Sequence, residues 1–163
     1  MAGLAMTMPM VCQAQDPLSS LTKVKVLTKQ GKTDDAVALC DAVLKRFGGK
    51  GATARQFAYV LPYYAWEKGV VYFRAGKYEE AFNAFKAFKD EPKWRDPAQL
   101  ARAKAAATGA GSKDAYEPYF TYALFQMANC RYKQAVGDPG KDNGDKAKFE
   151  EAIKYFEEYL DLV

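Results

Sequence analysis

The sequence predicts an all-α protein built from helical hairpins, and two observations support this fold class. Apolar residues recur at steps of three and four along most of the chain, which is the spacing of one helix face. Glycines interrupt these runs, as Gly76 does within GVVYFRAGKYEEAFNAFKAF, residues Gly69–Phe88. The stretch after this glycine places four residues on one face: Tyr78, Ala81, Phe85 and Phe88. Residues 62–89 are therefore expected to form two helices folded against each other around a tight turn.

The first hairpin is expected near residues 17–47. Asp16 favours the start of its first helix, because a carboxylate caps a helix whose next residue is proline, and Gly31 is expected to end that helix. Thr33 is then expected to cap a second helix, which places four residues on one face: Ala36, Cys40, Val43 and Leu44. The glycine and the first alanine of this hairpin have the same separation as those of the stretch around Gly76, so the two hairpins share one pattern.

The third hairpin is expected near residues 115–162. Asp114 to Glu117 have the form of a capping box, which opens a helix that runs to about Val136. A polar, glycine-rich loop over residues 137–144 follows. The last helix repeats the spacing of the second hairpin with Phe149, Ala152, Phe156 and Tyr159.

Two helical segments are expected between the hairpins. Residues 52–60 suit one or two helical turns. Asp96 starts an alanine-rich helix that runs to about Ala107, with Leu100 as its only large apolar residue. We expect this second segment to be a peripheral spacer.

Composition indicates one domain and argues against several classes of function. The 163 residues are 49% hydrophobic, which is enough for one domain with a core. The 24 basic and 20 acidic residues are interspersed, so no nucleic-acid partner is expected. Histidine is absent, which removes the commonest general base and metal ligand, and no phosphate loop or nucleophile elbow is present. We therefore expect a protein that is not an enzyme and that needs no cofactor.

The cysteines are Cys12, Cys40 and Cys130, and they lack the paired spacing of a structural zinc site, so no metal site is expected. Cys40 and Cys130 each lie in an apolar helical run, where cysteine behaves as a small buried hydrophobe. Since these two fall in the first and third hairpins, we expect free thiols.

Residues 1–14, MAGLAMTMPMVCQA, carry no charge and end in small residues at the places that a signal peptidase reads. We interpret them as the remnant of a secretory signal peptide cleaved after Ala14, without the Lys/Arg-rich start of such signals. Residues 15–163 are then the helical domain, exported to a bacterial periplasm or cell envelope. The segment is too short to span a bilayer as a helix. A disordered apolar tail on a cytoplasmic protein is the alternative.

The hairpins resemble the tetratricopeptide repeat (TPR). In that family a small residue and an aromatic on the first helix, here Gly69 and Tyr72, are combined with Gly, Tyr, Ala and Phe at the intervals seen from Gly76 to Phe88. The resemblance implies a TPR-like solenoid of about three irregular repeats that binds other proteins. Its equivalent alanines are 45 and then 71 residues apart, against about 34 in the family: Ala36, Ala81 and Ala152.

The resemblance also implies a binding surface, because one face of the first helices in tetratricopeptide proteins lines a concave groove for a peptide or a partner helix. The matching stripe occurs on two helices, as Tyr63, Trp66, Val70 and Phe73, and as Tyr122, Phe125, Asn129 and Tyr132. Aromatic side chains suit recognition, since they offer large contact areas with few rotors. The amide of Asn129 has both a donor and an acceptor for a peptide backbone.

Nearby cations are expected to favour acidic partner segments: Lys25, Arg74, Lys77, Arg131 and Lys133. The alternative for the two aromatic stripes is core packing, since a helix that is apolar on two faces can lie between its neighbours.

The last helix is a second candidate surface, formed by Ile153, Phe156, Leu160 and Leu162. An apolar solenoid edge is unfavourable to leave exposed, so we expect further repeats or another chain to cover it. The sequence thus favours a non-catalytic protein-protein interaction module that binds a peptide or partner helix on its aromatic concave face. The alternative is the N-terminal part of a larger cell-envelope assembly scaffold, in which the C-terminal edge makes the main contact by self-association or with further repeats.

Overall fold

The computed structural model of the protein describes residues 17–109, 118–137 and 144–163, apart from the side chains of residues 107–109. Four features predicted from the sequence lie wholly or mostly outside these ranges. They are the signal peptide of residues 1–14, which contains Cys12, the helix cap at Asp16, the capping box of residues 114–117 and the loop of residues 137–144. Every regular element within the described ranges is a helix, which confirms the all-α fold class.

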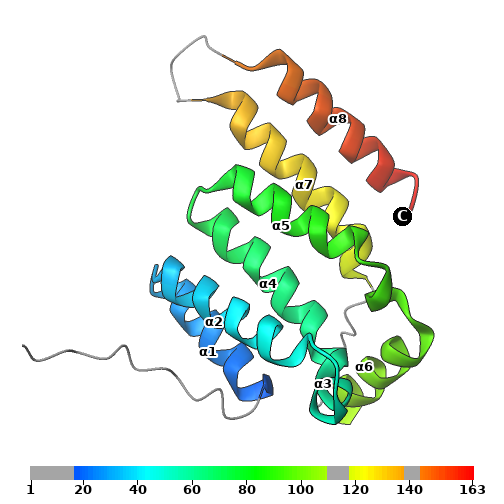
Figure 1. Ribbon diagram of the computed structural model, residues 1–163. Coiled ribbons are helices and arrows are strands. Elements are labelled where there is room, and N and C mark those ends of the chain that lie inside the picture. The colour runs from blue at the N-terminus through cyan, green and yellow to red at the C-terminus, as the bar shows by residue number, and fades with distance from the viewer. Residues whose placement is uncertain (1–16, 110–117, 138–143) are drawn as a thin grey trace, which may run out of the picture.

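Within the described residues, six helices pair into three hairpins that lie side by side (Figure 1). The pairs are α1 (Pro17–Lys29) with α2 (Thr33–Phe47), α4 (Leu61–Arg74) with α5 (Tyr78–Asp90), and α7 (Tyr119–Val136) with α8 (Lys146–Leu160). The second helix of each hairpin contacts the first helix of the next, since α2 packs on α4 and α5 packs on α7. The hairpins therefore stack as a solenoid.

Within the described residues, four further helices join the hairpins, on the side of the solenoid away from the turn of the second hairpin (Figure 1). They are α3 (Ala52–Phe57), η1 (Ala58–Val60), η2 (Pro92–Arg95) and α6 (Pro97–Gly109). Asp96 caps α6, because its carboxylate accepts a hydrogen bond from the Gln99 backbone at 3.0 Å. The α6 helix is more than a peripheral spacer: Leu100 and the buried Ala103 join an apolar cluster with Trp94.

The turns of the first two hairpins have the same geometry. Gly31 and Gly76 adopt φ values of 72° and 74°, in the left-handed region that favours glycine. The next residue in each turn donates a backbone hydrogen bond of 3.0 Å to a carbonyl five residues earlier. The expected Thr33 cap is wrong. The left-handed glycine makes Lys32 the N-cap, without a side-chain cap bond, and Thr33 is the first residue of α2.

A small residue allows the two helices of the second hairpin to approach closely. An added Cβ at Gly69 of α4 would lie 2.5 Å from the ring of Phe85 on α5, and Phe85 is fully buried. On the second helices, the equivalent alanines Ala36, Ala81 and Ala152 are likewise buried. The pattern seen in the sequence thus marks the contact inside each hairpin, which positions the remaining faces for other neighbours.

Three apolar clusters of described residues run along the solenoid. The first joins α1, α2 and α4, the second surrounds Phe88 and Trp94, and the third lies between α5 and α7 around Phe82. Cys40 is buried in the first cluster and Cys130 in the third; both are free thiols, as expected. Burial raises the pKa of each thiol to about 12.

Replacing Gly69 by alanine should lower the free energy of unfolding by about 1–2 kcal/mol. The clash with Phe85 is expected to exceed the roughly 1 kcal/mol that alanine gains in helix propensity. Urea denaturation followed by circular dichroism measures the change. Gly49→Ala is the matched control, because no atom lies within 4 Å of the Cβ it would add. A Gly69→Ala variant as stable as the wild type would contradict the close contact.

Candidate functional site

The predicted groove residues of α4 lie between the second and third hairpins. Tyr63 and Trp66 contact Tyr119 at the start of α7, with ring centroids 6.1 and 4.8 Å apart, and the rings of Trp66 and Tyr119 are stacked. Val70 and Phe73 pack against the cluster between α5 and α7. All four predicted residues are half-buried. On α4, this face therefore packs against the third hairpin.

The equivalent residues of α7 are more open to solvent. The exposed fractions of the three aromatic side chains are 48, 37 and 45% for Tyr122, Phe125 and Tyr132. Asn129, which lies between Phe125 and Tyr132 in the sequence, is half-buried. The Phe125 ring lies 5.7 Å from Phe156 and 5.4 Å from Tyr159, both on α8 of the same hairpin. No helix of the described chain covers this face from outside.

The α8 helix extends the open surface of α7. Ile153 is 56% exposed, and Tyr159 stacks on Tyr122 with ring centroids 6.5 Å apart. Leu160 and Leu162 are exposed at the end of the helix, while Phe156 is half-buried beside Phe125. The two surfaces predicted separately, the α7 stripe and the C-terminal edge, are thus adjacent. We call the surface that they form together the end face, and we define it by six residues of α7 and α8: Tyr122, Phe125, Asn129, Tyr132, Ile153 and Tyr159.

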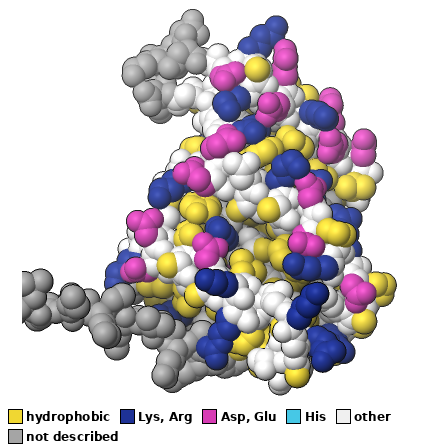
Figure 2. Space-filling model, in the orientation of Figure 1, with side chains coloured by type: hydrophobic (Ala, Val, Ile, Leu, Met, Phe, Trp, Pro, Cys, Tyr) yellow, Lys and Arg dark blue, Asp and Glu magenta, His cyan; other side chains and the backbone are white. Residues whose placement is uncertain are grey.

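The predicted preference for acidic partners is weakened by ion pairs within the chain. Lys25 lies 3.5 Å from Glu67, and Lys77 lies 3.5 Å from Asp34. Burial raises the pKa of the Glu67 carboxyl, although Lys25 opposes this effect. Basic and acidic side chains are also mixed over the face shown in Figure 2. This mixing gives no field of one sign to attract an acidic segment.

Arg131, also predicted to favour acidic partners, instead joins the second and third hairpins. Its side chain is only 11% exposed, and the guanidinium carbon lies 3.6 Å from the centroid of the Phe82 ring. The guanidinium forms ion pairs with Glu79 of α5 and, at 2.6 Å, with Glu151 of α8. Gln134 donates to Glu79 at 2.9 Å. This network links α5, α7 and α8, and hydrogen bonds from Gln134 and Arg131 hold the pKa of Glu79 below its usual range.

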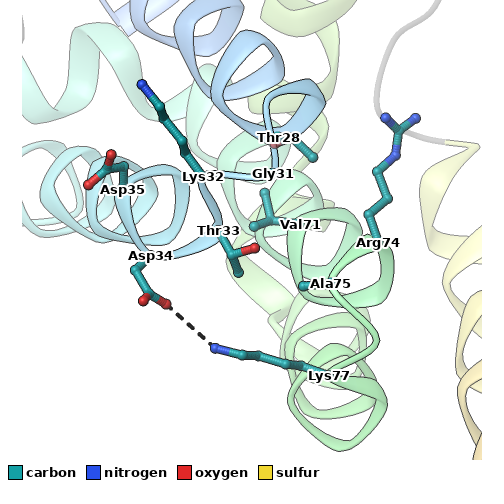
Figure 3. Close-up of a pocket in the computed structure, with 10 residues that line it drawn as sticks. All are labelled: Thr28, Gly31, Lys32, Thr33, Asp34, Asp35, Val71, Arg74, Ala75 and Lys77. Carbon is teal, nitrogen blue, oxygen red and sulfur yellow. Dashed lines mark hydrogen bonds and ion pairs between the residues drawn. The ribbon is translucent and has the colours of Figure 1, made fainter.

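A surface pocket of about 630 Å³ lies where the turn of the first hairpin meets the end of α4 (Figure 3). Val71 and Ala75 form part of its wall, and the pocket also contains the ion pair between Asp34 and Lys77. Lys32 and Arg74 also line the pocket (Figure 3). Charges of both signs line the pocket, so it shows no preference for one ligand class. The sequence pattern did not indicate this pocket, because its walls come from separate hairpins.

Within the described ranges, the structure contains no candidate metal cluster and no candidate membrane span. No three His, Cys, Asp or Glu side chains there are grouped closely enough to hold a metal ion. None of the helices described there combines the length and the apolar character needed to cross a membrane.

The fold and the end face together define a class: a helical-hairpin solenoid with an exposed aromatic surface. Residues 122–162 match the family model of the tetratricopeptide repeat, so the third hairpin is similar to that repeat and the match supports a TPR-like chain. The match covers α8 and most of α7, including the whole end face. A search of curated proteins returned no match, and a search of solved structures returned none.

Replacing Arg131 by alanine should lower the free energy of unfolding by about 1–2 kcal/mol, because the variant loses the packing on Phe82 and the link between hairpins. Arg131→Lys keeps the charge without the planar contact, so its loss should be smaller. Thermal and urea unfolding measure both, and the exposed Lys133→Ala is the control.

The effect of Arg131→Ala should also depend on pH. Since the pKa of Glu79 is lowered in the folded state, its contribution is present above its ordinary value of 4.5 and is lost as the pH falls through the lowered value. The stability difference between wild type and Arg131→Ala should therefore shrink in acid. A difference that stays constant between pH 7 and pH 3 would show that packing on Phe82 accounts for it alone.

Proposed function

We propose that the protein is a non-catalytic interaction module whose end face binds a peptide or helix of a protein partner. Tetratricopeptide repeats are typically non-catalytic modules that bind proteins, which supports the general class. The observation that carries the finer proposal is the exposed row of Tyr122, Phe125 and Tyr132 on α7. Aromatic side chains at these exposures are prominent contributors to binding when a partner covers them.

The other half of the predicted groove has a different place in this proposal. Trp66 stacks on Tyr119 and contacts Phe85 and Phe88, with ring centroids 5.0 and 5.7 Å away. Its truncation would disturb the stacking of hairpins, so a loss of binding in a Trp66 variant could arise from unfolding. The exposed residues of α7 are therefore the better positions for testing recognition.

A second candidate function is the structural one, in which the C-terminal edge joins a larger cell-envelope assembly. The exposed Leu160 and Leu162 at the end of α8 favour it. The two functions use neighbouring surfaces and differ in the residues that matter. Partner capture by the end face depends on Tyr122 and Tyr132, whereas assembly through the edge depends on the two leucines.

The test is affinity capture from an extract of the cells that contain the protein, with wild type and three double variants. Tyr122→Ser/Tyr132→Ser should lose the captured partner at least tenfold. Leu18→Ser/Val26→Ser, which changes exposed apolar residues on α1, should retain it. Circular dichroism checks that all four chains are folded. Equal recovery by the Tyr122→Ser/Tyr132→Ser and Leu18→Ser/Val26→Ser variants, or selective loss with Leu160→Ser/Leu162→Ser, would contradict binding at the end face.

We also propose that the protein is exported to the periplasm or envelope of a bacterium, on the basis of the uncharged apolar segment of residues 1–14. Cleavage after Ala14 would release a chain that starts at Gln15. Osmotic-shock fractions analysed by mass spectrometry should contain this N-terminus, and Ala14→Trp should block its formation. A chain that retains residues 1–14 and fractionates with a cytoplasmic marker enzyme would contradict export.

A further inference from the structure

The second and third hairpins repeat one set of ring contacts. Within the second hairpin, Trp66 contacts Phe85 and Phe88, and Phe73 contacts Tyr78, with ring centroids 5.0, 5.7 and 5.4 Å apart. The third hairpin has the three equivalent pairs at 5.7, 5.4 and 5.9 Å: Phe125 with Phe156, Phe125 with Tyr159, and Tyr132 with Phe149. The two hairpins can therefore be compared position by position.

In the second hairpin, this surface is covered by α7. Tyr119 stacks on Trp66 at 4.8 Å, and the next residue, Phe120, stacks on Phe88 at 5.0 Å. About three helical turns further along α7, Arg131 lies over Phe82 and forms an ion pair with Glu79. The covering helix thus contributes aromatic rings at one end and a guanidinium at the other, and small Ala123 lies between them in the adjoining cluster.

The third hairpin presents the same positions without the cover. Phe82, which α7 covers, is 5% exposed, whereas its equivalent Ile153 is 56% exposed. Glu150 is the equivalent of Glu79, and its carboxylate lies 3.7 Å from Lys146 of the same helix, in a pair that is largely exposed. The end face therefore retains the apolar and acidic groups of an interface between hairpins.

We propose that the partner segment is an α-helix that lies across the end face as α7 lies across α4 and α5. This inference rests on the proposed function and specifies its occupant. The helix carries an aromatic residue that stacks over Phe125, a small residue near its middle, and an arginine about three turns later that pairs with Glu150. The acidic position selects a cationic end of the helix, because α7 pairs Arg131 with the equivalent Glu79.

A second copy of this chain fits the end face less well. The helix that a second copy would offer in the same stacking order is α1, whose sequence PLSSLTKVKVLTK contains no aromatic residue and no arginine. Its exposed apolar residues are aliphatic, Leu18 and Val26. Such a helix has nothing to stack over Phe125 in the way that Tyr119 stacks over Trp66.

The probe is a synthetic helical peptide with the sequence of residues 118–137, stapled to keep it helical. Tyr122→Gln, Phe125→Lys, Tyr132→Gln and Val136→Gln changes in the peptide remove its exposed large apolar side chains and keep the face with which α7 contacts the second hairpin. Fluorescence anisotropy measures its binding to the full chain. Saturable binding is expected, and Phe125→Ala in the protein should weaken it by tenfold or more.

Variants of two exposed aliphatic residues distinguish binding of a helix at the end face from non-specific hydrophobic binding. Ile153→Asp should abolish peptide binding, because Ile153 occupies the place of Phe82. Leu162→Asp should leave binding unchanged, since Leu162 is also exposed but corresponds to Glu91, beyond the end of α5. Equal effects of the two variants, or binding that survives Ile153→Asp, would overturn the proposal.

Charge reversal tests the orientation of the helix. Glu150→Lys in the protein should weaken binding by about three- to tenfold, and Arg131→Glu in the peptide should restore it. Absence of peptide binding while cellular capture still depends on Tyr122 and Tyr132 would overturn the helical mode and leave the proposed function standing. Loss of that dependence in the capture experiment would contradict the proposed function itself. Peptide-independent dimerisation that Ile153→Asp abolishes would instead assign the face to a second copy.

Discussion

The close approach of the two helices within a hairpin is the constraint on which the rest of the structure depends. Gly69 allows the Phe85 ring to lie against the α4 backbone, and a side chain there would hold the helices apart. In the closed pair, Trp66 lies on the side that faces the third hairpin, where its ring stacks on Tyr119 of α7. The packing inside one hairpin thus forms the surface against which the next hairpin packs, and repetition of this contact builds the solenoid.

The sequence was sufficient for the helical pattern because periodicity and glycine turns are local properties. It identified the contact residues within each hairpin, such as Ala81 and Phe85, and both aromatic stripes. It was not sufficient to distinguish the stripe that is covered from the one that is open, since Trp66 and Phe125 have the same local surroundings. That difference arises from α7, which lies more than forty residues after Trp66 in the chain. Thr33 was misassigned for a local reason, the left-handed glycine before it.

Electrostatics were the least predictable part of the candidate site. Arg131 is a cation next to the aromatic stripe of α7, which suggested a role in recognition. Its guanidinium instead contacts Phe82, Glu79 and Glu151. These partners come from two other helices, α5 and α8, so no spacing within α7 could indicate them. The same cation that was expected to attract a partner instead fixes the third hairpin against the second. Because Arg131 pairs with Glu79, the equivalent acidic residue Glu150 indicates that a partner helix on the end face carries a cation at the matching position.

The two buried thiols give the protein internal reporters of opening. A thiol with a pKa near 12 is almost entirely protonated at neutral pH, and a protonated thiol in the core reacts slowly with alkylating reagents. Cys40 lies within the first hairpin's cluster and Cys130 lies at the boundary of the second and third hairpins. The labelling rate at each cysteine therefore measures how often its own part of the solenoid opens. The labelling rate of Cys40 thus reports opening of the first hairpin, and that of Cys130 reports separation of the third hairpin from the second.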